Sequence, residues 1–218
     1  MTPYDWTPED CAALATMVRN LGLTDARPFV AVWAHESDLD PRAHNPGGAS
    51  GLCQFEPATL RGLGYDAEDR DLSAFRALSA SAQMPWCERY YRGGRQWCSS
   101  VAGCYLWTFL PAQAHLCGSP LAIVCARWGP YADAYRDNCV AFDAPGTGRI
   151  QVSDLTDAAA RSWGPRAAGI LARVEAAPTE PTLPPEHVLC TCSLCRAERD
   201  GERRINSGAP PSPAGRFP

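Results

Sequence analysis

Residues 99–117, SSVAGCYLWTFLPAQAHLC, constrain the fold more than any other stretch of this chain. Apolar side chains recur on nearly every face of a helix drawn through them, which is typical of a helix that is buried all round. Such a helix has to be covered on each side by other elements. No alternating strand pattern longer than a few residues occurs elsewhere, so the cover must come from helices. The sequence predicts a mainly α fold with residues 99–117 as a central helix.

The covering helices have their own start and stop signals. Thr7 is placed to cap a helix over residues 7–21, with Pro8 in its first position and Asp10 completing a capping box. Further helices are expected over residues 24–37 with Thr24 as the cap, over a short stretch from Pro57, over 73–92, and over 154–176 with a break at Gly164-Pro165. Residues 119–128, SPLAIVCARW, are expected to continue the central helical layer.

Composition limits the classes of protein to which the chain can belong. It has 218 residues, of which 45% are hydrophobic, enough to build one cored domain with a small extension. The net charge is −4 and no basic block occurs, so nucleic-acid binding is not indicated. No apolar run reaches the roughly 18 residues that a membrane span needs. The first ten residues lack the features of a secretory signal, so we expect synthesis in the cytoplasm.

The composition changes near the end of the chain. Eight of the last 42 residues are Pro, and the remainder are mostly small, polar or Arg. Such a segment is typical of a linker or tail without a core of its own. We therefore expect a folded domain over 1–176, followed by a Pro-rich tail over 177–218 that serves as a docking segment.

Cysteine is abundant, with eleven residues in all. Eight lie between Cys11 and Cys139, which allows up to four disulfides in about a hundred connectivities; the alternative is a set of small buried thiols. A separate cluster in the tail combines three thiols and an imidazole within nine residues: His187, Cys190, Cys192 and Cys195. These ligands suit a structural zinc ion or an iron–sulfur cluster, although a disulfide or free thiols would also fit.

Glu36 is the residue whose setting most suggests chemistry. It shares a helical face with Phe29 and Trp33 and lies near the C-terminal end of the predicted helix. Burial and the negative end of the helix dipole both raise a carboxyl pKa. A carboxylic acid that stays protonated near neutral pH can act as the general acid in glycosidic cleavage. The plainer interpretation is a partly exposed acid at a helix end.

The residues that follow Glu36 favour the first interpretation. The stretch ESDLDPRAHNPGGASGLCQFEPATLRGLG resembles the signature of the lytic transglycosylases of the soluble, goose-lysozyme-like group. The matching positions are Glu36, Ser37, Pro41, Ala43, Asn45, Pro46, Gly48, Ala49, Gly51, Leu52, Gln54, Phe55, Pro57 and Thr59. A looser similarity to a phage-associated branch of this family extends to about residue 155.

The resemblance implies a lysozyme-like fold, peptidoglycan glycan strands as substrate, and no cofactor for catalysis. It implies that Glu36 is the single acid/base, first protonating the oxygen between MurNAc and GlcNAc and then accepting the proton of the muramyl 6-hydroxyl. Ser37 would bind near the acid or the sugar, and Gln54 would line the cleft. Gly and Pro residues between them shape the loop that returns Gln54 towards Glu36.

The chain departs from the family pattern in the central helix. The family often places a Tyr there that approaches the catalytic Glu, whereas Leu110-Pro111 occupies the corresponding position here. Phage-associated relatives tend to have the pattern that Tyr105, Leu106, Pro111 and Ala112 satisfy. Tyr105 is therefore a candidate substrate-binding residue, and a buried structural tyrosine is the alternative.

Residues 143–154, DAPGTGRIQVSD, have the outline of a calcium loop. Asp143 stands first, Gly148 sixth and Asp154 twelfth, but Pro145 and Thr147 occupy ligand positions. Too few carboxylates remain for a hard cation, so we interpret the segment as a degenerate loop retained for its turn.

The function expected from the sequence is that of a peptidoglycan lytic transglycosylase associated with a phage virion, where tail or baseplate proteins would bind its C-terminal segment. A goose-type hydrolytic muramidase acting as an endolysin is the first alternative. A catalytically silent structural component of a tail or baseplate is the second. The protein is expected to be carried by the virion or released to the cell wall by another route.

Overall fold

The computed structural model describes residues 2–65, 72–143 and 145–178, and within these ranges the fold is mainly α. The two short strands, β1 (Ile123–Ala126) and β2 (Arg149–Gln151), pair antiparallel. The helices, in chain order, are α1 (Pro8–Asn20), α2 (Arg27–Ser37), α3 (Pro57–Gly62), α4 (Ser73–Arg76), α5 (Ala80–Arg92), α6 (Val101–Phe109), the 3-10 helix η1 (Pro111–Gly118), α7 (Ala132–Phe142), α8 (Val152–Ser162) and α9 (Pro165–Glu175).

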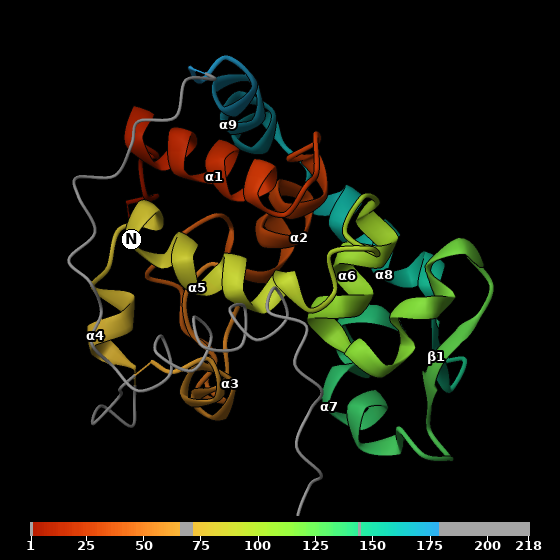
Figure 1. The fold of residues 1–218 in the computed structure, drawn as a ribbon. Helices are drawn as coiled ribbons and strands as arrows, with labels where there is room; N and C mark the ends of the chain where they lie inside the picture. Colours follow the sequence, from red (N-terminus) through yellow and green to blue (C-terminus); the bar gives the residue numbers. More distant parts are fainter. Residues whose placement is uncertain (1, 66–71, 144, 179–218) are drawn as a thin grey trace, which may run out of the picture. The chain divides into compact units, whose positions relative to one another are not determined.

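Helix α2 occupies the centre of the helical packing. It contacts α6, α8 and α9, while α1 lies between α5 and α9 (Figure 1). The side chains of Phe29, Val30, Val32 and Trp33 on α2 are fully buried. The ring of Phe29 meets that of Tyr91 from α5 edge-on, with 4.9 Å between their centroids. The helix that carries Glu36 is thus held on several sides by close packing.

The prediction of one long central helix over residues 99–117 was wrong in its extent. Helix α6 ends at Phe109, and Leu110 adopts φ −150° and ψ 82°. Pro111 disfavours the α conformation of the residue before it and provides no backbone N–H, so the chain continues as a 3-10 helix. Residues 103–106 are buried, whereas the flanking positions of α6 are partly exposed.

Three further boundaries differ from the predictions. Helix α2 begins at Arg27 rather than after Thr24, and the Asp25 carboxylate accepts a hydrogen bond from the Arg27 amide at 2.8 Å. The expected helix over 73–92 is divided, because Ser79 caps a separate helix α5 by accepting from the Ala82 amide at 3.2 Å. The segment after Ser119 forms β1 instead of a helix, since it pairs with β2.

The start of α1 is confirmed as a capping box. The Thr7 hydroxyl accepts from the Asp10 amide at 3.1 Å, and the Asp10 carboxylate accepts from the Thr7 amide at 2.9 Å. The same carboxylate accepts from the Ser81 amide at 2.7 Å and from the Tyr4 hydroxyl at 3.0 Å. Burial alone would raise the pKa of Asp10, but these hydrogen bonds together lower it. Asp10 therefore joins α1 to the first turn of α5.

The calcium-like segment is closed by its own hydrogen bonds. The Asp143 carboxylate accepts from the Tyr135 hydroxyl at 2.8 Å, from the Thr147 amide and hydroxyl at 2.7 and 2.9 Å, and from the Gly148 amide at 2.8 Å. Burial would raise the pKa of Asp143, and these bonds hold it well below its usual value. The carboxylate that would bind a cation thus organises the turn before β2. In the part of the chain that the structure describes, no group of three or more His, Cys, Asp or Glu could hold a metal ion.

The candidate tail ligands His187, Cys190, Cys192 and Cys195 lie outside the described residues, so the proposed metal site stays a prediction. The division into 1–176 and 177–218 is likewise untested, although α9 ends at Glu175. None of the described helices is long and apolar enough to cross a membrane.

Candidate active site

Glu36 lies in the last turn of α2, next to the helix terminus at Ser37. The residue is half-buried, and removal of its carboxyl group from water raises the pKa to about 7. The Tyr105 hydroxyl acts in the opposite direction by favouring the ionised form. The negative end of the α2 dipole adds to the effect of burial. Glu36 therefore exchanges its proton near neutral pH, as a group that serves as both acid and base requires.

Tyr105 from α6 faces Glu36. Its side chain is fully buried, and its hydroxyl oxygen has no hydrogen-bond partner in normal geometry among the described residues. Burial first, and then Glu36, raise the pKa of this phenol, so it stays protonated. The ring packs against His35 and Phe142, with 5.8 Å between centroids in each case. The structure thus places the Tyr105 hydroxyl beside the Glu36 carboxyl group, with a hydrogen to donate.

A Tyr105→Phe variant tests this contact. Loss of the hydroxyl removes the influence that lowers the pKa of Glu36, so we expect that pKa to rise. The alkaline limb of the pH–activity profile should then move to higher pH, while maximal lysis falls by about tenfold because one hydrogen bond to the developing carboxylate is lost. Lysis of purified cell walls from pH 4 to 9 measures both. A Tyr65→Phe variant, altered at a ring that packs against Phe75 and Trp86, is the control. An unshifted alkaline limb in Tyr105→Phe would contradict the contact.

The chain reverses direction immediately after α2. Asp38 and Leu39 both adopt left-handed conformations, with φ of 51° and 58°. Non-glycine residues rarely adopt this region, and two in succession need support from their surroundings. The Leu39 amide donates to Trp33 O at 3.2 Å, and the Leu39 carbonyl accepts from Trp6 Nε1 at 2.8 Å. The N-terminal segment thereby helps to hold the turn that follows Glu36.

Ser37 connects the end of α2 to the loop that returns towards it. Its hydroxyl lies 2.9 Å from Trp33 O and 3.0 Å from Leu52 O, and the residue is buried. The hydroxyl proton can therefore be donated to either backbone carbonyl. Ser37 also borders a surface depression with Asp38, Asp40 and Arg42. These contacts indicate that Ser37 positions the loop. Its expected contact with the sugar stays a prediction.

Gly51 and Gln54 form the tight turn of this loop. Gly51 has a φ of +79°, and a Cβ atom at this position would lie 2.6 Å from both Gln83 Oε1 and Phe75 Cε1. Only glycine fits such a site. Gln54 has a φ of +48°, and its side-chain amide donates to Gly51 O at 3.0 Å. The half-buried Gln54 side chain is thus folded against its own turn, and its place in a substrate cleft stays a prediction.

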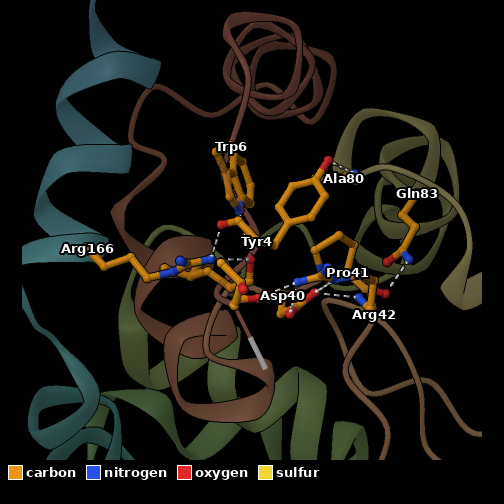
Figure 2. A network of polar contacts seen from close by, with 10 residues as sticks. Tyr4, Trp6, Asp40, Pro41, Arg42, Ala80, Gln83 and Arg166 are labelled. Carbon is orange, nitrogen blue, oxygen red and sulfur yellow. Dashed lines mark hydrogen bonds and ion pairs between the residues drawn. The ribbon is translucent and has the colours of Figure 1, made fainter.

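Gln83 on α5 organises the loop, although it was not among the residues predicted from the sequence. This fully buried side chain accepts from the Leu52 amide at 3.1 Å through Oε1. Its Nε2 donates to Pro41 O at 2.7 Å and to Phe75 O at 3.2 Å. Figure 2 shows Gln83 pointing at Pro41, within the polar contacts that surround the turn. A polar residue spaced three after Ala80 and four before Cys87, on the buried face of α5, is the signal that could have revealed it.

Part of the chain matches a known protein family. Residues 23–84 match the sequence model described as the transglycosylase SLT domain. This range contains α2, the loop and the first part of α5, and so includes Glu36, Ser37, Gln54 and Gln83 but not Tyr105. No curated protein and no solved structure matches the chain. The match covers less than a third of the chain, and it supports a lytic transglycosylase activity on peptidoglycan for the segment that contains Glu36.

Proposed function

We propose that this protein is a peptidoglycan lytic transglycosylase that cleaves the β-1,4 bond between MurNAc and GlcNAc with Glu36 as its single acid/base. The observation that carries the proposal is the pKa of about 7 at Glu36, in a segment of transglycosylase SLT sequence. A group with this pKa is populated in both protonation states near neutral pH. It can therefore donate a proton in one step and accept one in the next.

In the first step, protonated Glu36 donates its proton to the glycosidic oxygen as the bond from that oxygen to C1 of MurNAc breaks. The leaving GlcNAc end departs as an alcohol, and positive charge develops at the muramyl C1. The Tyr105 hydroxyl, already facing Glu36, can then donate to the newly formed carboxylate. That hydrogen bond forms most strongly when the charge appears, so it stabilises the transition state more than the resting acid.

In the second step, the Glu36 carboxylate accepts the proton of the muramyl 6-hydroxyl while that oxygen attacks C1. The product is a 1,6-anhydro ring, and Glu36 returns to its protonated form without consumption of water. Glycosidases that use water or a covalent intermediate generally need a second carboxylate. Among the described residues, the influences that set the pKa of Glu36 are desolvation and the Tyr105 hydroxyl, and no second carboxylate is among them.

Analysis of the products tests the proposal directly. We expect purified peptidoglycan treated with the protein to give muropeptides that end in 1,6-anhydro-MurNAc, each lighter by one water than the hydrolysed equivalent. Mass spectrometry distinguishes the two, and the Glu36→Gln protein is the control for contaminating enzymes. Products that carry only reducing-end MurNAc would replace this proposal by the goose-type hydrolytic muramidase. Absence of any cleavage by soluble, folded protein would favour a structural component instead.

We also propose that the protein acts as part of a phage virion. The support is the similarity of Tyr105, Leu106, Pro111 and Ala112 to the pattern of phage-associated relatives. Mass spectrometry of purified virions tests it: we expect the chain among the particle proteins, whereas its presence only in the lysate would favour an endolysin.

A further inference from the structure

Four buried cysteines gather where the loop after α2 meets α5 and α6. Cys53 lies in the loop, Cys87 on α5 and Cys104 on α6, and Cys98 precedes α6; each is at most 4% exposed. The sulfur atoms of Cys53 and Cys87 are 3.3 Å apart. Cys98 directs its sulfur to Gly94 O at 3.3 Å and also interacts with Cys104. The four cysteines therefore form two pairs, Cys53 with Cys87 and Cys98 with Cys104. The pair of Cys53 and Cys87 joins segments that are 34 residues apart.

We propose that Cys53 and Cys87 form a disulfide when the chain folds under oxidising conditions, and that this bridge fastens the loop of Gly51 and Gln54 to α5. The inference concerns covalent structure and does not depend on the proposed activity. It selects one pair among the many that the cysteine count allows.

The backbone around the two thiols is already held in register. Gln83 and Cys87 are four residues apart on α5, so their side chains lie on the same face one turn apart. Gln83 accepts from the Leu52 amide at 3.1 Å, and Cys87 contacts the next residue of the loop, Cys53. A disulfide bond is about 2 Å long, so the sulfurs need to approach by only about 1 Å.

The oxidation balances as a thiol–disulfide exchange with a small disulfide such as oxidised glutathione. One cysteine thiolate attacks the glutathione disulfide and releases one glutathione thiol. The second cysteine then attacks the protein sulfur of the mixed disulfide and releases the other. The two protein thiols lose two protons and two electrons, and one glutathione disulfide becomes two thiols.

Burial determines when this exchange can occur. Burial first, and then the neighbouring Cys87, raise the pKa of the Cys53 thiol well above its usual value. The reactive species is the thiolate, so the folded dithiol is a poor nucleophile. The exchange is therefore expected while the chain folds, before the loop closes over α5. A chain that folds in reducing conditions keeps the pair as an inert contact.

The absence of Lys from the sequence makes a sharp test possible, because trypsin then cleaves only after Arg. Residues 43–61 form one tryptic peptide with Cys53 as its single cysteine, and residues 77–89 form another with Cys87. Cys98 and Cys104 fall together in the peptide 96–127. The unfolded, reduced full-length protein is diluted into a buffer of reduced and oxidised glutathione. Remaining thiols are alkylated, the protein is digested, and the peptides are identified by mass spectrometry.

The expected result is a species that joins 43–61 to 77–89, with the summed mass of the two peptides less two hydrogen atoms, and that disappears on reduction. A Cys11→Ala variant, altered at a buried thiol on α1, should retain this species. A Cys87→Ala variant should lose it and yield alkylated 43–61. Recovery of both wild-type peptides only in alkylated form, or a link from 43–61 to 96–127, would overturn the proposal. The wild-type map decides the matter even if the Cys87 variant folds poorly.

Discussion

A Glu36→Gln variant is expected to lose lytic activity by about 10²–10⁴-fold, which is the range that general acid–base catalysis contributes. The amide has nearly the same shape as the carboxylic acid, but it can neither donate the proton nor accept it afterwards. Turbidity loss of a cell-wall suspension measures the effect. A Glu175→Gln variant, altered at the exposed end of α9, is the matched control and should retain full activity. Lysis by Glu36→Gln within tenfold of wild type would remove Glu36 from the mechanism.

The same substitution is expected to stabilise the fold at alkaline pH. The pKa of Glu36 is about 7 in the folded protein, against 4.5 as its ordinary value. Between these values the folded state holds a proton that the unfolded state has released, so the free energy of unfolding falls as pH rises. The loss at pH 8 amounts to about 3 kcal/mol, because each unit of pKa corresponds to about 1.4 kcal/mol. Glutamine does not titrate and avoids this loss.

Urea unfolding at pH 4 and pH 8 measures the linkage. The difference in free energy of unfolding between the variant and wild type should grow by about 3 kcal/mol in favour of the variant from the lower to the higher pH. The Glu175→Gln control should differ from wild type in free energy of unfolding by the same amount at pH 4 and at pH 8. A pH-independent difference for Glu36→Gln would show that the acid is not buried as described. If Glu36→Gln is both more stable and less active than wild type, the acid is retained for activity at a cost in stability.

The position of Glu36 in the last turn of a packed helix could be predicted from the sequence because the evidence for it is local. Phe29, Trp33 and Glu36 follow the helical repeat, and the Pro and Gly residues that end the helix are visible in the next turn of sequence. The capping box at Thr7 and the break at Gly164-Pro165 were predictable for the same reason, since each depends on residues within a few positions of one another.

The supports of the site depend on contacts that are distant in sequence. Gln83 is separated from Leu52 by 31 residues, and only the packing of α5 against the loop brings them together. Asp38 and Leu39 both adopt left-handed conformations although neither is a glycine, so the sequence gives no sign of this turn. A tertiary hydrogen bond from Trp6, rather than a local preference, holds the turn in place. Helix α6 was predicted too long, since its apolar pattern continues beyond the point where Pro111 ends the α conformation.

Gln83→Leu is expected to destabilise the protein by about 4 kcal/mol, more than any exposed substitution. Leucine has a similar volume but offers no polar atom, so the Leu52 amide and the carbonyls of Pro41 and Phe75 all lose their Gln83 partner. Each buried group left unsatisfied costs about 1–3 kcal/mol, and partial relaxation of the loop reduces the sum. Denaturant unfolding measures the change. A Gln96→Leu variant at an exposed position should change the free energy of unfolding by less than about 0.5 kcal/mol.

A local measurement separates loss of the loop from general destabilisation. The Leu52 amide should exchange with solvent deuterium much faster in Gln83→Leu than in wild type, because its acceptor is gone. The exchange rates of amides in the middle of α1, such as that of Leu14, should change only as far as the global stability of the protein changes. Full protection of Leu52 with a stability change below about 1 kcal/mol would contradict the anchoring role of Gln83. If the anchor holds, the loop after Glu36 owes its shape to α5, because Gln83 binds the backbone of that loop at both Pro41 and Leu52.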